Sequence, residues 1–257
     1  MPPHFGEAPS LTSFQALTCF TMAQVKALIF DVFGTLVDWR TGVAAEAGRM
    51  FGAKGIAIDP FDFADQWRGE YQPAMRRIRE GARGYVPLDI LHRENLDIVL
   101  EKNAISARFD AAERETLNHA WEKLPAWPDV PDALAALKER FITAPCSNGS
   151  IAMMVRLARF AGLSWDAILG ADIARDYKPK PQTYLASVAA LGLTPDAVMM
   201  VAAHNDDLQA AQDCGLKTAF IARPHEYGPD ANVEITPTGD WNCAATDLGY
   251  LADILMA

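Results

Sequence analysis

Close to the N-terminal end of the chain, an apolar run ends in a carboxylate. Residues 25–30 are apolar apart from Lys26, Asp31 follows them, and Gly34 and Thr35 come next in a short turn. A run of this length bounded by a turn predicts a buried strand. Ligands bind at the carboxyl ends of strands in open α/β sheets, so we expect Asp31 to act as a nucleophile. The simpler alternative is an Asp that only accepts hydrogen bonds from the backbone of the turn.

Short apolar runs alternate with amphipathic segments over most of the chain. Further strands are predicted at 141–146, 167–169, 197–202 and 217–221, and helices at 130–140, 151–160, 181–191 and 207–214. This alternation predicts an α/β fold with a doubly wound parallel sheet. Residues 39–124 interrupt it, because they contain no convincing strand. That stretch has long helical segments at 61–80, 87–102 and 110–123.

The chain therefore divides into three predicted parts. Residues 1–22 form a flexible N-terminal extension, residues 23–38 and 125–257 form a Rossmann-like α/β core, and residues 39–124 form an inserted, all-helical cap domain. The extension lacks the basic start of a signal peptide. Met22 is an alternative start of the protein.

Composition excludes several classes of partner. The 257 residues carry a formal net charge of -10, which disfavours nucleic acid and anionic membranes as partners. No apolar run reaches the roughly 18 residues needed to span a bilayer. The four cysteines are far apart, so we expect reduced thiols in a cytoplasmic protein. The expected partner is a small anionic substrate, and a homodimer is left open.

Three short motifs carry a resemblance to a known family. They are D-x-x-G-T-L at 31–36, S-N-G at 147–149 and Y-K-P at 177–179. In this order, with a helical insert after the first, they resemble the haloacid dehalogenase superfamily, whose catalytic Asp forms a covalent intermediate. The S-N-G motif specifically resembles the type II (L-2-)haloacid dehalogenases. The resemblance extends from Val25 to about Leu251.

This resemblance implies roles for residues in the first two motifs. Asp31 is the nucleophile, and Thr35 hydrogen-bonds its carboxylate. Ser147 holds the substrate carboxylate, and Asn148 cradles the departing halide. These two residues also precede a predicted helix, whose N-terminus favours an anion. The alternative is a simple helix cap without a ligand, because Ser-Asn-Gly-Ser is also good capping chemistry.

In the third motif, the resemblance implies that Lys178 lies beside the nucleophile and keeps it ionised. Lys180 competes for this role, and alone either Lys would be expected to be solvated. Tyr184 matches a tyrosine that lies near the site in the dehalogenases, or it packs within its helix.

Two departures from the phosphatases of the superfamily affect the reaction. Those enzymes place an acid two residues after the nucleophile, where this chain has Phe33, and an acidic pair in a fourth motif, where it has Ala203 and Asp207. The resemblance therefore implies that no magnesium is required, and Phe33 becomes part of the substrate and halide pocket. Asp207 is implied to orient Lys178 and the hydrolytic water, unless it only caps a helix.

The chain also departs from the dehalogenases within this fourth motif. His204 replaces an Asn, and Asp206 replaces an aromatic residue that walls the halide pocket. An N–H of His204 suits a small, strongly accepting halide such as fluoride. A structural histidine is an equal alternative.

The predicted cap contributes one further candidate. Trp67-Arg68 resembles the W-R segment of the dehalogenase cap, where the Arg reaches the halide and the substrate. Arg68 is favoured over the arginines at 76, 77 and 79, which share a basic face. The alternative is a surface Arg beside a core Trp.

These residues together predict a hydrolytic dehalogenase of short 2-haloacids, such as haloacetates. Attack by Asp31 expels the halide and leaves an aspartyl ester, which water hydrolyses to a 2-hydroxy acid. The alternatives are a magnesium-dependent phosphatase of the same superfamily and a non-catalytic binding protein on this scaffold. The sequence leaves the preferred halogen, the enantioselectivity, the oligomeric state and the physiological role open.

Overall fold

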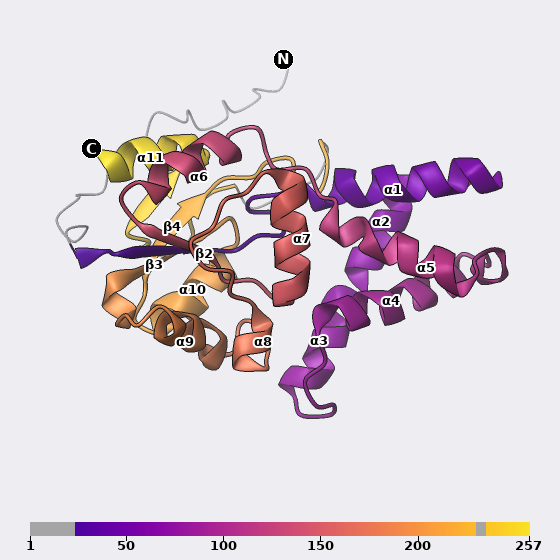
Figure 1. Ribbon diagram of the computed structural model, residues 1–257, viewed down its shortest axis with the longest axis horizontal. Helices are drawn as coiled ribbons and strands as arrows, with labels where there is room; N and C mark the ends of the chain where they lie inside the picture. Colours follow the sequence, from indigo (N-terminus) through magenta and orange to yellow (C-terminus); the bar gives the residue numbers. More distant parts are fainter. Residues whose placement is uncertain (1–23, 230–234) are drawn as a thin grey trace, which may run out of the picture.

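One parallel sheet forms the centre of the computed structural model, which describes residues 24–229 and 235–257 (Figure 1). Its strands follow the order β2-β1-β3-β4-β5. They are β1 (Ala27–Phe30), β2 (Ile142–Pro145), β3 (Val198–Ala202), β4 (Lys217–Ile221) and β5 (Cys243–Ala245). All pairings are parallel, with Phe30 beside Pro145 and Val201. The predicted α/β fold is confirmed, and the predicted N-terminal extension lies outside the described residues.

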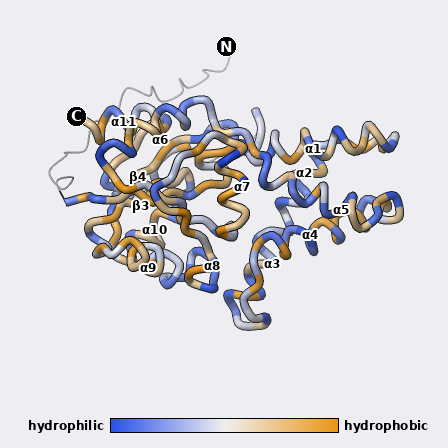
Figure 2. Tube along the Cα trace, in the orientation of Figure 1, coloured by the Kyte–Doolittle hydropathy of each residue, from blue (hydrophilic) through white to orange (hydrophobic). Residues whose placement is uncertain are grey.

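Helices cover both faces of the sheet. One layer contains α6 (Val130–Lys138), α7 (Ile151–Ala161) and α11 (Leu248–Met256). The other layer contains α9 (Pro181–Ala190) and α10 (Asn205–Asp213). The short helix α8 (Ala171–Ala174) precedes α9 in the chain, and the 3₁₀ turn η5 (Pro195–Ala197) precedes β3. Side chains alternate along a strand. Leu28 and Phe30 accordingly pack with the first layer, and Ala27 and Ile29 pack with the second. Hydrophobic colour concentrates along the central strands and α7 (Figure 2).

Every element between residues 39 and 122 is helical. The elements are α1 (Trp39–Lys54), α2 (Pro60–Gly69), α3 (Tyr71–Arg79), α4 (Leu88–Lys102), η3 (Ser106–Arg108), α5 (Ala111–Asn118) and η4 (His119–Glu122). Local sequence sets several boundaries. Asp59 caps α2 ahead of Pro60, and Asp110 forms a capping box with Glu113. The division into a core and a cap domain at residues 39 and 125 stays a prediction.

Three predicted elements differ from the structure. The helix at 61–80 breaks at Glu70 into α2 and α3, and the helix at 110–123 continues only as the 3₁₀ turn η4 after Asn118. The strand predicted at 167–169 is wrong. There the backbone N–H of Asp166 donates a hydrogen bond to Thr143 O of the edge strand β2. The next pairing is an isolated bridge between Ser147 and Gly170. The predictions also omit α1, α11 and β5, of which β5 has only three residues and gives too short an alternation to detect.

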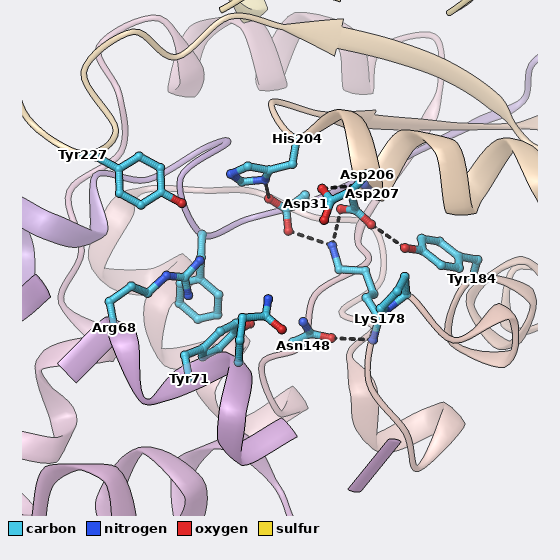
Figure 3. A pocket seen from close by; sticks show the side chains of 13 residues that line it. Asp31, Arg68, Tyr71, Asn148, Lys178, Tyr184, His204, Asp206, Asp207 and Tyr227 are labelled. Atoms are coloured by element: carbon cyan, nitrogen blue, oxygen red, sulfur yellow. Dashed lines mark hydrogen bonds and ion pairs between the residues drawn. The ribbon is translucent and has the colours of Figure 1, made fainter. Parts of the chain in front are cut away.

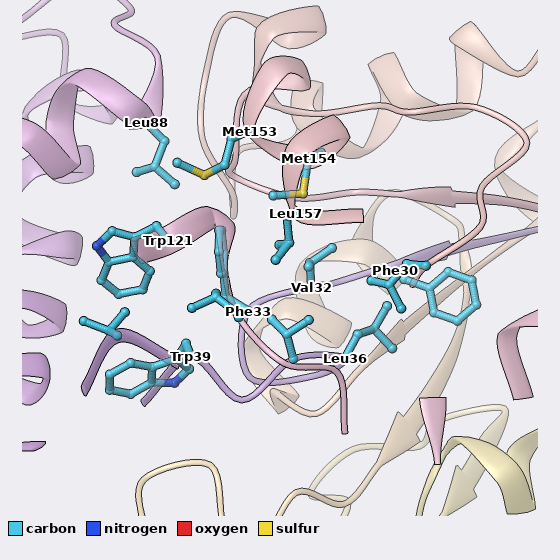
Figure 4. Close-up of a cluster of buried hydrophobic side chains, with 14 of the residues drawn as sticks. Phe30, Val32, Phe33, Leu36, Trp39, Leu88, Trp121, Met153, Met154 and Leu157 are labelled. Carbon is cyan, nitrogen blue, oxygen red and sulfur yellow. The ribbon is translucent and has the colours of Figure 1, made fainter. Parts of the chain in front are cut away.

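A buried aromatic cluster joins the sheet to the helical insert (Figure 4). Phe33, two residues after the nucleophile candidate, lies edge-on to Trp121, with ring centroids 6.0 Å apart. Trp121 in turn stacks on Trp39 at 6.1 Å. These rings continue the core that surrounds Phe30, so the two parts of the chain share one hydrophobic interior.

We expect the packing of α1 on α2 to depend strongly on Phe51. Its ring is 2% exposed and lies 5.0 Å from that of Phe63. Phe51→Ala should lower the free energy of unfolding by about 3–5 kcal/mol in urea titration, since it removes a buried ring and leaves a cavity. The matched control is Phe160→Ala, at a ring that is 55% exposed, with an expected change of about 0.5 kcal/mol or less. Equal urea midpoints for the two variants would contradict this packing.

Candidate active site

Three strand ends, one loop and one helix of the insert contribute residues around one cavity (Figure 3). Asp31 follows β1, Asn148 follows β2 and His204 follows β3. Lys178 comes from the loop before α9, and Arg68 reaches in from α2. The cavity measures about 170 Å³, so it suits a small molecule.

The Asp31 carboxylate is buried, and both of its oxygens have partners. Oδ1 accepts a hydrogen bond from Lys178 Nζ at 2.7 Å, and Oδ2 accepts one from Thr35 Oγ1 at 2.7 Å. The Ala203 N–H donates to Thr35 Oγ1 at 3.0 Å, which directs the hydroxyl proton toward Asp31. Burial alone would raise the pKa of Asp31, but Lys178 and His204 lower it well below its usual range. Asp31 is therefore ionised at neutral pH.

A second carboxylate fixes the position of Lys178. Asp207 Oδ2 lies 2.5 Å from Lys178 Nζ, and Tyr184 donates its hydroxyl proton to Asp207 Oδ1 at 2.5 Å. The backbone N–H of Lys178 donates to Asn148 Oδ1 at 2.8 Å. Burial opposes the charge of Lys178, but Asp207 and Asp31 raise its pKa above the usual value. The ammonium is thus protonated at neutral pH while Asp31 and Asp207 are both ionised beside it.

His204 lies between two carboxylates. Its Nδ1 is 3.2 Å from Asp31 Oδ2, and its Nε2 is 2.9 Å from Glu226 Oε2. Burial opposes a charge on the ring, but the hydrogen bonds to Asp31 and Glu226 raise the pKa of His204 well above its usual value. Since a carboxylate oxygen can only accept, both ring nitrogens carry protons and His204 is an imidazolium.

The glycine of the first motif makes room for this arrangement. Gly34 has φ +86°, and a Cβ built on it would lie 2.1 Å from Glu226 Oε1. Trp39 Nε1 donates to the same oxygen at 3.2 Å. Gly34 therefore serves both the left-handed turn and the close approach of a buried carboxylate.

Arg68 presents an unused donor to this region. Its Nη1 is buried and has no hydrogen-bond partner among the described residues. The guanidinium lies over the ring of Tyr71, 4.1 Å from the centroid, and 5.3 Å from that of Trp39. A buried N–H of a cation without an acceptor is costly, so the site suits an anion that supplies one.

The cavity unites most of the predicted site residues. The predicted residues that line it are Asp31, Phe33, Arg68, Asn148, Lys178, Tyr184, His204 and Asp207. Thr35 donates a hydrogen bond to Asp31. Ser147 does not line it, and its hydroxyl oxygen accepts from the Gly149 N–H at 3.1 Å. Of the competing cations, Lys180 precedes α9, and Arg79 donates to Lys178 O at 3.1 Å.

Sequence reasoning missed four residues at the site. They are Tyr71, Gln72, Glu226 and Tyr227. Glu226 and Tyr227 follow β4, so the strand-end rule that selected Asp31 would also have pointed to their loop. Tyr71 lies three residues beyond Arg68, although α2 ends between them and the helical spacing alone does not place it.

The donor set does not fit a divalent cation. At the positions where related phosphatases hold magnesium or place their acid, Ala203 and Phe33 offer no oxygen. Lys178 and His204, both cationic, already occupy the oxygens of Asp31. Within residues 24–229 and 235–257, no three His, Cys, Asp or Glu side chains group to hold a metal ion.

Comparison with known proteins identifies the family. A model of the haloacid dehalogenase-like hydrolases matches residues 25–215, so the chain belongs to that family. The crystal structure of a defluorinating L-2-haloacid dehalogenase is 48% identical, with a TM-score of 0.89 over 91% of this chain and 96% of that one. A second L-2-haloacid dehalogenase structure is 42% identical, with a TM-score of 0.84 over 90% and 99%. (S)-2-haloacid dehalogenase 1 of Pseudomonas sp. (strain CBS-3) is 31% identical over 80% of this chain and 89% of its own.

The family membership predicted from the sequence is thus confirmed. In the described part of the chain, no helix is long and apolar enough to cross a membrane.

We expect Gly34→Ala to disturb the site through Glu226. The matched control is Gly81→Ala, because Gly81 has a similar φ of +78° but nothing within 4 Å of the point where an added methyl carbon would lie. Both variants bear a backbone cost of roughly 1–2 kcal/mol. Only Gly34→Ala should lose more stability than this in urea titration and lose activity as well, because its methyl group displaces a buried carboxylate. Equal losses in the two variants would show that the approach of Glu226 is unimportant.

Proposed function

We propose that this protein is a hydrolytic dehalogenase of short 2-haloacids, which releases halide and a 2-hydroxy acid. The names of its relatives support this proposal, since three of them, 31% to 48% identical over most of the chain, are 2-haloacid dehalogenases. They confirm the activity predicted from the sequence. The roles of individual residues are proposed below from the geometry of this chain.

One observation carries the assignment beyond the family. An ionised carboxylate, Asp31, shares a small cavity with Arg68, a half-buried cation whose buried Nη1 has no acceptor among the described residues. Phe33, in place of an acid, cannot protonate a leaving group. A halide leaves as an anion and needs no proton, so this combination suits carbon–halogen cleavage better than phosphate ester cleavage.

In the first step, Asp31 attacks the halogen-bearing α-carbon. Oδ1 is the attacking atom, because among the described residues it contacts Lys178 alone, whereas Oδ2 accepts two hydrogen bonds. A new C–O bond forms as the C–halogen bond breaks, and the halide departs with the bonding electrons. Arg68 and Asn148 stabilise the halide, Phe33 walls its pocket, and an aspartyl ester remains.

In the second step, water hydrolyses this ester at Cγ of Asp31. Asp207 lies beside Lys178 and accepts the proton that the water loses. The bond between Cγ and Oδ1 breaks, Oδ1 leaves with the product, and Lys178 lies close enough to protonate it. Asp31 keeps the oxygen of the water and releases one proton to solvent. Tyr184 holds Asp207 in place for this step.

The substrate carboxylate binds on the opposite side of the site. Ser147 and the backbone of its loop lead into α7, whose N-terminus favours negative charge. Reaching the substrate requires the Ser147 hydroxyl to exchange its present contact with Gly149. Closure of residues 39–124 over the core excludes bulk water from the reaction.

The proposed function also implies which cofactor, partner and cellular location the enzyme has. The enzyme acts without magnesium, because its residues supply cations where a metal would lie. Its partner is a small anionic substrate, and it works as a cytoplasmic protein. The thiols of Cys146 and Cys214, which form no disulfide, suit a reducing compartment.

Halide release tests this function directly. We expect fluoride, chloride or bromide from at least one of fluoroacetate, chloroacetate and bromoacetate, with unchanged rates after treatment with a chelator. Asp31→Asn should lower the rate by more than about 10⁴-fold, because it removes the nucleophile. Metal-dependent turnover of phosphate monoesters without halide release would instead identify a phosphatase. Ligand binding without any turnover would identify a binding protein.

Arg68 provides a second test. Arg68→Gln should reduce kcat for halide release by about 10²–10³-fold, because a donor to the developing halide is lost. Arg76→Gln, at an exposed arginine of α3, is the matched control and should leave kcat unchanged. Equal rates for wild type and Arg68→Gln would exclude a role of Arg68 in halide stabilisation.

A further inference from the structure

We propose that His204 is a catalytic residue of the ester-hydrolysis step, in which its Nδ1–H and the Thr35 hydroxyl form an oxyanion hole around Oδ2 of Asp31. Glu226 is the positioning residue that holds the ring. This inference rests on the proposed function, because it concerns the second step of that reaction.

The two oxygens of Asp31 have different surroundings. Oδ2 accepts from Thr35 Oγ1 at 2.7 Å and from His204 Nδ1 at 3.2 Å, whereas Oδ1 faces Lys178. Once Oδ1 carries the substrate, Oδ2 becomes the carbonyl oxygen of the ester. Attack of water on Cγ then moves the π electrons onto Oδ2. Two donors already surround the atom on which this negative charge develops.

The same contacts explain why His204 is held as a cation. Its ring nitrogens face Asp31 Oδ2 and Glu226 Oε2, so each must donate. When Asp31 becomes an ester, it loses its charge, but Glu226 remains. The ring therefore keeps one anionic partner throughout the second step, and it offers a charged donor to the tetrahedral intermediate.

Glu226 is built firmly into the fold. It is 3% exposed, it accepts from Trp39 Nε1, and it fills the space beside Gly34. Arg223 connects its loop to the nucleophile loop, because it donates a hydrogen bond to Thr35 O at 2.7 Å. Arg223 also forms a bidentate salt bridge with Asp129. These contacts fix the carboxylate that orients His204 with respect to Asp31.

This geometry gives His204 a different role from the halide donor that the sequence suggested. Both of its N–H groups are directed at carboxylates, so neither is free for a halide. The unused donor lies instead on Arg68. His204 thus acts on the enzyme's own oxygen.

Bonds, electrons and protons balance in the hydrolysis step without a further reactant. Water adds to Cγ and gives one proton to Asp207, while Oδ2 takes the electron pair of the C=O bond. The C=O bond reforms as the Cγ–Oδ1 bond breaks, and the alkoxide of the product takes a proton from Lys178, which Asp207 reprotonates. The Asp31 carboxyl group then loses its remaining proton to solvent.

Separate measurement of the two steps tests this proposal with chloroacetate. In rapid-quench experiments, His204→Ala should keep a stoichiometric burst of chloride but slow the release of glycolate by about 10²–10³-fold. The first step should not slow, because loss of a cationic partner raises the pKa of Asp31 and makes it a better nucleophile. The ester should therefore accumulate and be detectable by intact-protein mass spectrometry.

Two further variants separate chemistry from structure. His204→Asn keeps a neutral N–H donor and should hydrolyse the ester at a rate between wild type and His204→Ala. His225→Ala, at the exposed histidine next to Glu226 in the chain, is the matched control and should accumulate no ester. Urea titration of each variant shows whether the protein is folded under the assay conditions.

Glu226→Gln tests the positioning role through the pH dependence of ester hydrolysis, which a purely structural role of Glu226 would leave unchanged. Wild-type ester hydrolysis should decline on the alkaline side as the imidazolium loses its proton. Without the anion of Glu226, this decline should begin at least about one pH unit lower. The other ionisable groups that line the two cavities beside His204 are the same in both proteins, and they include Arg68, Tyr71, Lys178, Asp206, Asp207, Arg223 and Tyr227.

The outcomes distinguish the two proposals. If wild type releases no halide from any haloacetate, the proposed function fails. If wild type is active but His204→Ala slows chloride and glycolate equally and accumulates no ester, the function stands and the oxyanion role is overturned. An unchanged alkaline limb in Glu226→Gln would likewise overturn the positioning role of Glu226.

Discussion

The burial of one ionised carboxylate governs the rest of the site. Asp31 lies at the end of a fully buried strand, where an unpaired charge would be strongly unfavourable. Lys178 and His204 offset that cost, and each needs a second carboxylate in turn, Asp207 and Glu226. The result is a chain of alternating charges, in which removal of any one member leaves a neighbour buried without its partner.

The parallel sheet makes this chain of charges possible. The carboxyl ends of β1, β3 and β4 lie at one edge, and the residues that follow them are Asp31, His204 and Glu226 in the same order as the strands. The loop before α9 brings Lys178 to the other oxygen of Asp31. The two oxygens of Asp31 have different partners. The fold therefore distinguishes the attacking oxygen from the one that becomes a carbonyl oxygen.

Part of this arrangement could be predicted from the sequence. Asp31 follows a clear strand pattern, whereas the roles of Lys178 and Asp207 were implied only by the order of motifs shared with the haloacid dehalogenase superfamily. The strand-end rule points to the loop after β4 but does not select Glu226 within it, since the role of this residue depends on space beside Gly34, nearly two hundred residues away in the chain. The false strand at 167–169 failed for the same reason: its backbone bonds go to Thr143, which no local pattern reveals.

Phe33 has a mechanical consequence in addition to its chemical one. Its ring packs against Trp121 and His92 of the helical insert, at 6.0 and 6.4 Å, while its backbone belongs to the loop that carries Asp31. The helical insert cannot lift away from the sheet without either separating these rings or pulling on the nucleophile loop. The packing of the helical insert and the alignment of the attacking oxygen are therefore mechanically coupled through a single side chain.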